Sequence, residues 1–306
     1  MTFKVFYHPN CQKHENGPGH VESPMRYESV ENELQKSSGL TFIEAPMVTN
    51  ETLESVHSKS HIRIVHESVE AGGTQLDPDT GTNLHSWEAS GRAAGATVEA
   101  VKDVVAHGGR SFCLVRPPGH HALHDQVMGF CLFNNVALGA EAAINLGMKR
   151  IAIFDFDVHH GNGTEAIFYD RPDVHFSSVH QSPLYPGTGA RDDRGNGAGK
   201  GTTLNIPLSA GSGDKELLNA WREEIRPAWE HFNPELVLLS AGFDGDARDP
   251  VGGLVYTPSG YETLSSEILA WTQEQNGIGI VSVLEGGYNC AALAEDVRIH
   301  IDVLKA

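Results

Sequence analysis

The segment Asp155–Gly163 carries the densest set of groups that could bind a metal ion. It continues an apolar run, Ile151–Phe154, that predicts a buried β-strand. Side chains two residues apart in a strand share a face, so we expect Asp155, Asp157 and His159 to lie together at the strand's end. Two buried carboxylates beside an imidazole favour Zn²⁺ or a similar divalent cation. The alternative is a polar strand end that only hydrogen-bonds to loops.

Two adjacent histidines form a second candidate group. His120 and His121 follow the apolar run before Arg116 and a Pro117-Pro118-Gly119 turn. On an irregular turn, adjacent side chains can face one pocket, which a regular strand would forbid. The pair then suits general acid–base catalysis. The alternative is that one histidine caps the turn while the other is solvated.

Two further apolar runs end in polar groups. Leu236–Ala241 precedes Asp244, and Ile278–Leu284 precedes Tyr288. Parallel sheets bind ligands at the carboxyl ends of their strands, where all these groups would meet. Asp157, His159 and Asp244 make three ligands, the number that leaves a catalytic zinc site a position for water. With a histidine pair and a tyrosine hydroxyl, the set predicts metal-assisted hydrolysis of an acyl or amide bond.

Alternating strands and helices are expected to position these groups. The predicted strands are Val5–Tyr7, Ser111–Arg116, Ile151–Asp157, Val174–Val179, Leu236–Ala241 and Ile278–Leu284. The predicted helices include Trp87–His107, Asn134–Leu146, Lys215–His231 and Pro258–Gln275. Continuously apolar strands between helices are typical of a parallel sheet covered on both faces. The Gly-rich segment Gly195–Thr202 lacks the phosphate-loop pattern and is interpreted as a loop, so residues 1–306 are predicted to form a single domain.

Composition narrows the function further. The chain has 306 residues and a formal net charge of −18, which argues against nucleic acid and anionic membranes as partners. Its four cysteines lack C-x-x-C spacing, which predicts reduced thiols in a cytoplasmic protein. We find neither a signal peptide nor a membrane span in the sequence. Whether the chain forms a homo-oligomer is left open.

Taken together, the motifs resemble the histone deacetylase superfamily, which includes acetylpolyamine amidohydrolases and acetoin-utilisation proteins. The matching stretches, in the family's order, are Gly17–His20, Glu22–Arg26, Arg116–Ala122, Gly129–Asn135, Asp155–Thr164, Tyr185–Gly189, Ser240–Asp244, Asp249–Pro250 and Glu285–Asn289. The resemblance implies an arginase-like, three-layer α/β fold with a central, mostly parallel sheet of about eight strands flanked by helices.

The resemblance also implies roles for the site residues. Asp157, His159 and Asp244 would hold Zn²⁺, although Fe²⁺ and Co²⁺ accept the same ligands. His121 would be the general base and then the acid, and Tyr288 would bond the substrate carbonyl and the oxyanion. His120 would bond to Asp155. Asn162 stands where some branches place an aspartate that orients the base, which leaves the pH profile open. Two structural K⁺ sites are implied as well, one using Asp155, Ser178 and main-chain oxygens of Asp157, His159 and Val179, and one using Phe168, Arg171 and Val174.

Substrate contacts follow from the same resemblance. Phe130 and Tyr185 match the aromatic walls of an acyl-lysine tunnel, with core aromatics as the alternative, and Gly129 and Gly287 lie beside them. Asp79, or Asp77, matches an acid at the rim. Val251 replaces the acidic gatekeeper of polyamine-specific relatives, which favours an acyl-lysine substrate over an acetylated polyamine or another small acyl-amide. A dimetal ureohydrolase and a non-catalytic acyl-lysine-binding module are the competing hypotheses. Beyond Asp244, Gly245–Arg248 departs from the family pattern and adds an acid, Asp246.

Overall fold

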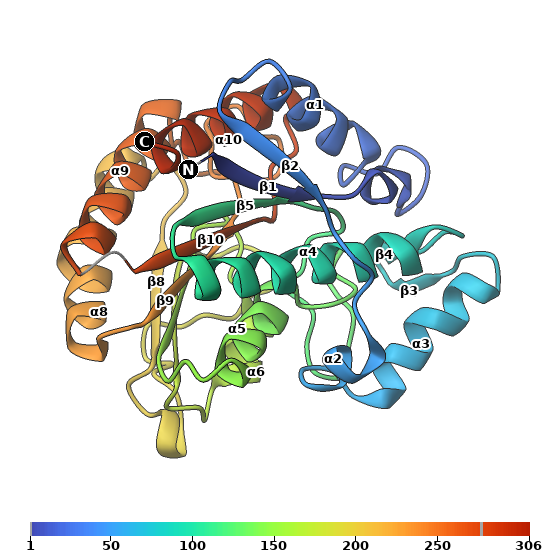
Figure 1. Ribbon diagram of the computed structural model, residues 1–306, viewed down its shortest axis with the longest axis horizontal. Helices are drawn as coiled ribbons and strands as arrows, with labels where there is room; N and C mark the ends of the chain where they lie inside the picture. Colours follow the sequence, from blue (N-terminus) through green and yellow to red (C-terminus); the bar gives the residue numbers. More distant parts are fainter. Residues whose placement is uncertain (1, 276–277) are drawn as a thin grey trace.

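A central eight-stranded sheet organises the chain (Figure 1). The computed structural model describes residues 2–275 and 278–306. The strand order is β2-β1-β5-β10-β9-β6-β7-β8, and all neighbouring strands in this sheet run parallel. The strands are β1 (Phe3–Tyr7), β2 (Leu40–Glu44), β5 (Arg110–Leu114), β6 (Ile151–Asp155), β7 (Val174–Gln181), β8 (Thr203–Leu208), β9 (Leu236–Ala241) and β10 (Gly279–Leu284). A small antiparallel hairpin, β3 (Gln75–Asp77) and β4 (Thr80–Gly81), stands apart.

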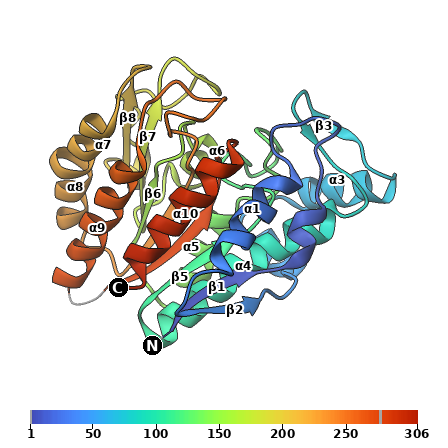
Figure 2. The same cartoon turned by 90° about the horizontal axis from the view of Figure 1, so that it is seen from above.

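Helices cover both faces of the sheet and create two hydrophobic cores. One core packs α1 (Pro24–Leu34), α7 (Asp214–Asn219), α8 (Arg226–Phe232), α9 (Pro258–Glu274) and α10 (Cys290–Leu304) against the sheet. The other uses α2 (Asn50–Glu54), α3 (Lys59–Glu70), α4 (Ser86–His107), α5 (Asn135–Asn145) and α6 (Asn162–Phe168). Figure 2 shows α1 and α10 on the opposite side of the sheet from α4. Strands β6, β7, β9 and β10 are buried along their whole length, as expected for a sheet covered on both faces.

The predicted α/β class and the sheet of about eight parallel strands are confirmed. The strands β2, β3, β4 and β8 and the helices α1, α2, α3, α6 and α10 were not among the predicted elements. The predicted helix Lys215–His231 is one helical stretch with three parts, because a π-helical turn, Ala220–Ile225, separates α7 from α8. Pro227 lies at the start of α8 and lacks the N–H that a continuous α-helix would use there.

Other sequence expectations can be compared directly. Residues 195–202 form a loop with a short 3₁₀ turn, Gly197–Gly199, between β7 and β8 of the same sheet. All four cysteines are free thiols, and Cys11, Cys113 and Cys131 are buried. Within residues 2–275 and 278–306, no helix is long and apolar enough to cross a membrane.

Candidate active site

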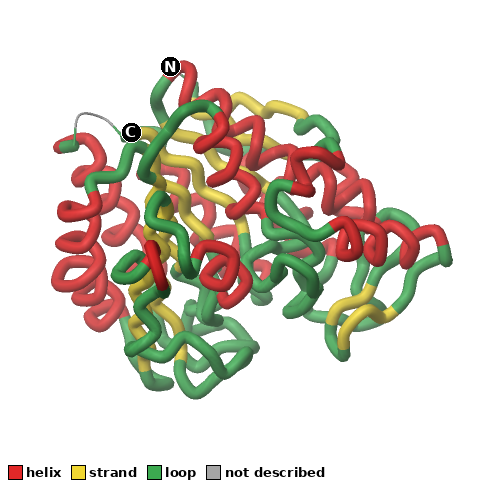
Figure 3. Tube along the Cα trace, turned by 90° about the horizontal axis from the view of Figure 1, so that it is seen from below, coloured by secondary structure: helices red, strands yellow, loops and turns green. Residues whose placement is uncertain are grey.

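Four loops at the carboxyl edge of the sheet bring the predicted groups together. The segments that follow β5, β6, β9 and β10 are loops, drawn green in Figure 3. These four strands are neighbours in the order β5-β10-β9-β6, so their loops converge. One prediction was wrong in detail: β6 ends at Asp155, so Asp157 and His159 lie in the loop and not on a strand face. The loop nevertheless brings them together, because the N–H of Asp157 donates to Asp155 and the N–H of His159 donates to Asp157.

Asp157, His159 and Asp244 form a buried cluster whose ligand atoms all lie within 4.8 Å of one another. Nδ1 of His159 lies 3.0 Å from Oδ1 of Asp157 and 3.3 Å from Oδ2 of Asp244. One oxygen of each acid is fixed by the backbone: Gly286 donates its N–H to Oδ2 of Asp157 at 2.8 Å, and Val158 donates to Oδ1 of Asp244 at 2.8 Å. The three ligand side chains are therefore held in place without any added group.

The donor set fits a divalent cation. Oδ2 of Asp244 is buried and has no hydrogen-bond partner among the described residues. Burial and the charge of Asp157 raise the pKa of Asp244 to about 7, and a cation beside the two acids would stabilise their charged forms. Two carboxylates and one imidazole are ligands that Zn²⁺ accepts. Glycine is required at 286, because a Cβ there would lie 2.1 Å from Oδ2 of Asp244.

The two histidines face different partners. Nδ1 of His120 donates to Oδ2 of Asp155 at 2.9 Å, and Nδ1 of His121 donates to Oδ1 of Asn162 at 2.7 Å. Burial alone would lower the pKa of His120, but Asp155 and Asp157 raise it well above its usual value. Burial and the positive charge of His120 hold the pKa of His121 well below its usual value. His120 therefore favours its charged form, while His121 keeps a neutral ring with a free Nε2, as a general base needs.

Tyr288 lies in the loop between β10 and α10. Its backbone N–H donates to Oδ2 of Asp249 at 2.6 Å, and the guanidinium of Arg26 lies 4.9 Å from its ring centroid. Gly287 has a φ of 121°, a conformation that glycine adopts readily. Burial raises the pKa of Tyr288 well above 10, so its hydroxyl remains a hydrogen-bond donor.

Aromatic rings line the approach to these groups. The ring of Tyr185 lies 5.2 Å from that of His121 and 6.3 Å from that of His159. The ring of Phe130 lies 5.9 Å from that of Tyr288. Gly129 has a φ of 57°, and a Cβ there would lie 2.3 Å from the His121 ring. The backbone at Gly129 therefore approaches His121 too closely for any side chain at this position. Phe130 and Tyr185 are thus not ordinary core residues, because neither is fully buried.

The predicted rim residues lie on loops beside this wall. Asp79 is part of the β3–β4 hairpin, and its N–H donates to Oδ1 of Asp77 at 3.1 Å. The neighbouring Thr80 hydroxyl accepts the N–H of Phe130 at 3.0 Å, which ties the hairpin to the aromatic wall. Val251 is partly buried and donates its N–H to Oδ1 of Asp249. Each rim residue is thus one contact away from Phe130 or from the Tyr288 turn.

The residues predicted to bind K⁺ fall into two neighbouring places. Asp155 and Ser178 are paired in register between β6 and β7, and Val179 follows directly. Phe168, Arg171 and Val174 lie around the turn from α6 into β7. The carbonyl of Phe168 accepts the N–H of Arg171, and that of Arg171 accepts the Thr202 hydroxyl. Both K⁺ sites stay predictions.

The sequence alone did not reveal the polar network beneath the site. Glu22 is fully buried and pairs with Arg116 and Arg26, and Arg26 donates to the carbonyls of Gly287 and Glu285. Glu285 in turn accepts the N–H groups of Gly119 and His120. These residues belong to the matched motifs, but only the tertiary contacts show that they hold the turn of His120 and the turn of Tyr288.

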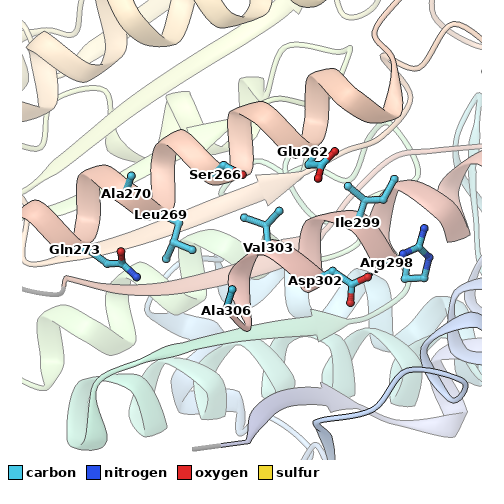
Figure 4. A pocket seen from close by; sticks show the side chains of 10 residues that line it. All are labelled: Glu262, Ser266, Leu269, Ala270, Gln273, Arg298, Ile299, Asp302, Val303 and Ala306. Atoms are coloured by element: carbon cyan, nitrogen blue, oxygen red, sulfur yellow. Dashed lines mark hydrogen bonds and ion pairs between the residues drawn. The ribbon is translucent and has the colours of Figure 1, made fainter.

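A groove lies elsewhere on the described part of the chain. It has a volume of about 640 Å³ and runs between α9 and α10, and its lining includes Leu269, Val303, Arg298 and Asp302 (Figure 4). None of the site residues above lines it. We therefore place the candidate active site by its chemistry and not by cavity size.

Comparison with known proteins agrees with this site. The sequence matches the Histone deacetylase domain family over residues 20–304. The chain belongs to the histone deacetylase family. The family supports hydrolase activity, and relatives from a plant, an archaeon and a bacterium are similar over most of this chain. "Histone deacetylase 14, chloroplastic" of Arabidopsis thaliana is 37% identical, over 96% of this chain and 75% of its own length. A "Probable deacetylase" of Archaeoglobus fulgidus is 35% identical, over 94% of this chain and 82% of its own.

Other family members extend the likeness to bacteria and to a solved structure. The "Histone deacetylase-like amidohydrolase" of Pseudomonas aeruginosa is 36% identical, over 89% of this chain and 73% of its own length. The crystal structure of the HDA15 HD domain superposes with a TM-score of 0.94 at 33% identity, covering 99% of this chain and 90% of that one. The deacetylase fold of this chain is thereby shown along nearly its whole length.

Proposed function

We propose that this protein is a zinc-dependent amidohydrolase that removes acyl groups from N-acyl-lysine-type amides. The observation that carries the proposal is the buried cluster of Asp157, His159 and Asp244, with an unpartnered Asp244 oxygen, next to the His121–Asn162 pair. A zinc ion held by these three residues would supply a Lewis acid that polarises the amide carbonyl and lowers the pKa of a water molecule.

The chain's own residues account for the proton transfers. Asn162 accepts a hydrogen bond from Nδ1–H of His121. This leaves Nε2 free to take a proton from the attacking water and to give it to the leaving amine. The charged His120, fixed by Asp155, adds positive potential beside the reacting carbonyl. The Tyr288 hydroxyl would donate to the oxygen that becomes negative. No Asp is needed next to His121, although the neutral Asn162 stabilises an imidazolium less than a carboxylate would.

The choice of an acyl-lysine-type substrate has three supports. Phe130 and Tyr185 offer apolar walls suited to a lysine methylene chain. Val251 offers no charge to a polyamine, and the relatives include proteins named as histone deacetylases. The formal charge of −18 favours a polycation, but bulk charge is screened within about 8 Å at physiological salt.

We also propose that K⁺ binds beside Asp155 and Ser178. Nε2 of His180 lies 3.1 Å from the carbonyl of Gly189 and must donate to it, so Nδ1 is the acceptor. The Ser178 hydroxyl, 2.9 Å from that Nδ1, then donates a hydrogen bond to His180, which leaves its oxygen lone pairs free to bind a cation. Activity measured in K⁺-free buffer, with choline as the replacement cation, should be lower and should recover on adding KCl. Equal activity in K⁺-free buffer and after adding KCl would refute this K⁺ site.

The test of the main proposal is turnover of a fluorogenic acetyl-lysine peptide, measured with and without a zinc-chelating hydroxamate. Hydroxamate-sensitive turnover that disappears in Tyr288→Phe supports the proposal. A strong preference for acetylspermidine over the peptide would overturn the substrate class but not the chemistry. Two metal ions per chain by elemental analysis would favour a dimetal ureohydrolase, and tight peptide binding without hydrolysis would favour a binding module.

A further inference from the structure

We propose that Arg248 is a positioning residue that ties the Tyr288 turn to the loop carrying Asp244. The inference rests on the proposed function, because it assigns Arg248 a task in that reaction. Arg248 lies in the Gly245–Arg248 segment where the sequence departs from the family pattern. Its contacts join that loop to the first turns of α10, which begins directly after Tyr288 and Asn289.

The side chain of Arg248 bridges two elements. Its guanidinium forms a bidentate ion pair with Asp246, in which Nε donates to Oδ1 at 2.8 Å and Nη2 donates to Oδ2 at 2.9 Å. Toward α10, Nη1 donates to Glu295 at 2.7 Å, and Nη2 lies 3.6 Å from Oδ1 of Asp296. The planar guanidinium suits such paired contacts, which the single ammonium of lysine cannot reproduce.

The backbone of the same loop holds the Tyr288 turn. The carbonyl of Arg248 accepts Nδ2–H of Asn289 at 2.9 Å, and Asn289 also caps α10 by accepting the N–H of Ala292. Oδ2 of the next residue, Asp249, accepts the N–H groups of Tyr288 and Asn289 at 2.6 and 3.1 Å. The position of Tyr288 therefore depends on where residues 248 and 249 sit relative to α10.

The burial of its two acidic partners makes Arg248 difficult to replace. Asp246 and Asp296 are 2% and 0% exposed, and neither oxygen of Asp296 has a hydrogen-bond partner among the described residues. Arg248 is the cation that contacts both acids. The Glu295 contact is exposed and contributes little. Without the guanidinium, the contacts that join Asp246 on the loop to Asp296 and Glu295 on α10 would be lost, and the two elements would no longer be held together.

The test compares Arg248→Met in the wild-type and Tyr288→Phe backgrounds. In the wild type, kcat should fall about 10–100-fold with KM changed less than about twofold, because a displaced hydroxyl weakens transition-state contacts and not substrate binding. In the Tyr288→Phe background, the same change should cost less than about twofold. Equal losses in both backgrounds would overturn the proposal, because Arg248 would then act through another group.

Hydrogen exchange tests the link without activity. We expect faster amide exchange in the peptide covering residues 285–292 of metal-free Arg248→Met than in the matched control Arg222→Met. Arg222 is 48% exposed against 43% for Arg248 and also makes a two-armed pair, with Glu267, but far along the chain from the site. Unchanged exchange would overturn the proposal even if the wild type shows no deacetylase turnover, whereas missing turnover alone would refute only the proposed function. Should Arg248→Met fail to fold, Arg248→Lys keeps the charge without the two-armed grip, and full wild-type kcat in Arg248→Lys would equally overturn it.

Discussion

Replacing Glu22 by Gln should destabilise the folded protein by about 3–5 kcal/mol, the typical cost of removing one partner from a buried ion pair. Glu22 is fully buried and is the anion shared by two guanidinium groups. Oε2 accepts Nη2 of Arg116 at 2.7 Å, and Oε1 accepts Nη1 of Arg26 at 2.9 Å. A glutamine keeps the shape but leaves two buried cations without a counter-charge, which costs far more than a lost surface pair.

The magnitude has a second, independent basis. Burial alone would raise the pKa of Glu22, but the charges of Arg116 and Arg26 lower it from 4.5 to about 2. Because the pKa is lower in the folded state, the carboxylate stabilises the protein fully above pH 4.5, and this contribution disappears as the pH falls toward 2. At about 1.4 kcal/mol for each unit of pKa difference, the contribution at neutral pH is about 3 kcal/mol.

The assay is urea unfolding at pH 7 of chelator-treated protein, followed by the fluorescence of the buried tryptophans Trp221, Trp229 and Trp271. Glu33→Gln is the matched control, because Glu33 also pairs with an arginine and a lysine but is partly exposed. The control should lose less than about 1 kcal/mol. A loss below about 1 kcal/mol in Glu22→Gln, or a stability difference from wild type that persists unchanged down to pH 2, would refute the reasoning.

Three further predictions address catalysis, metal binding and pH. Tyr288→Phe should lower kcat by about 10²–10³-fold, the usual cost of one oxyanion donor, while its urea midpoint stays at the wild-type value; kcat near wild type would break the mechanism. Zinc at about 100 times its Kd should stabilise the chelator-treated wild type by about 2.7 kcal/mol but leave Asp244→Asn unchanged, and equal stabilisation of both proteins would exclude Asp244 as a ligand. Burial lowers the pKa of His300, which lies between Ser265 and Ser282, to about 3. In the unfolded chain His300 takes up a proton near pH 6.5, so the stability that its neutral form contributes is present above that pH and declines below it. Between pH 6.5 and 4 the wild type should therefore lose up to about 3 kcal/mol of unfolding free energy that His300→Asn does not lose. The same dependence of unfolding free energy on pH in both proteins would contradict this.

The sequence by itself determined the class of fold and most of the chemistry of the site. Apolar runs of strand length are nearly sufficient to locate β6, β9 and β10, because strands buried on both faces must be apolar throughout. The edge strand β2 escaped prediction because it is only partly buried and its pattern is weak. Likewise, Asp157, His159 and Asp244 could be named as candidate ligands from residue type and position after a strand, and the structure brings their ligand atoms together.

The tertiary structure decided how these groups are held. Glu22 and Arg116 are far apart in sequence, and so are Arg248 and Asp296, so neither pairing leaves a local pattern in the chain. These residues meet because β5, β10 and β9 are neighbours in the sheet and α1 packs against α10. A buried charge without such a partner would cost several kcal/mol, so each of these residues makes physical sense only in the folded molecule. The local sequence specifies which atoms can do chemistry, while long-range packing specifies where they stand and which proton each one carries.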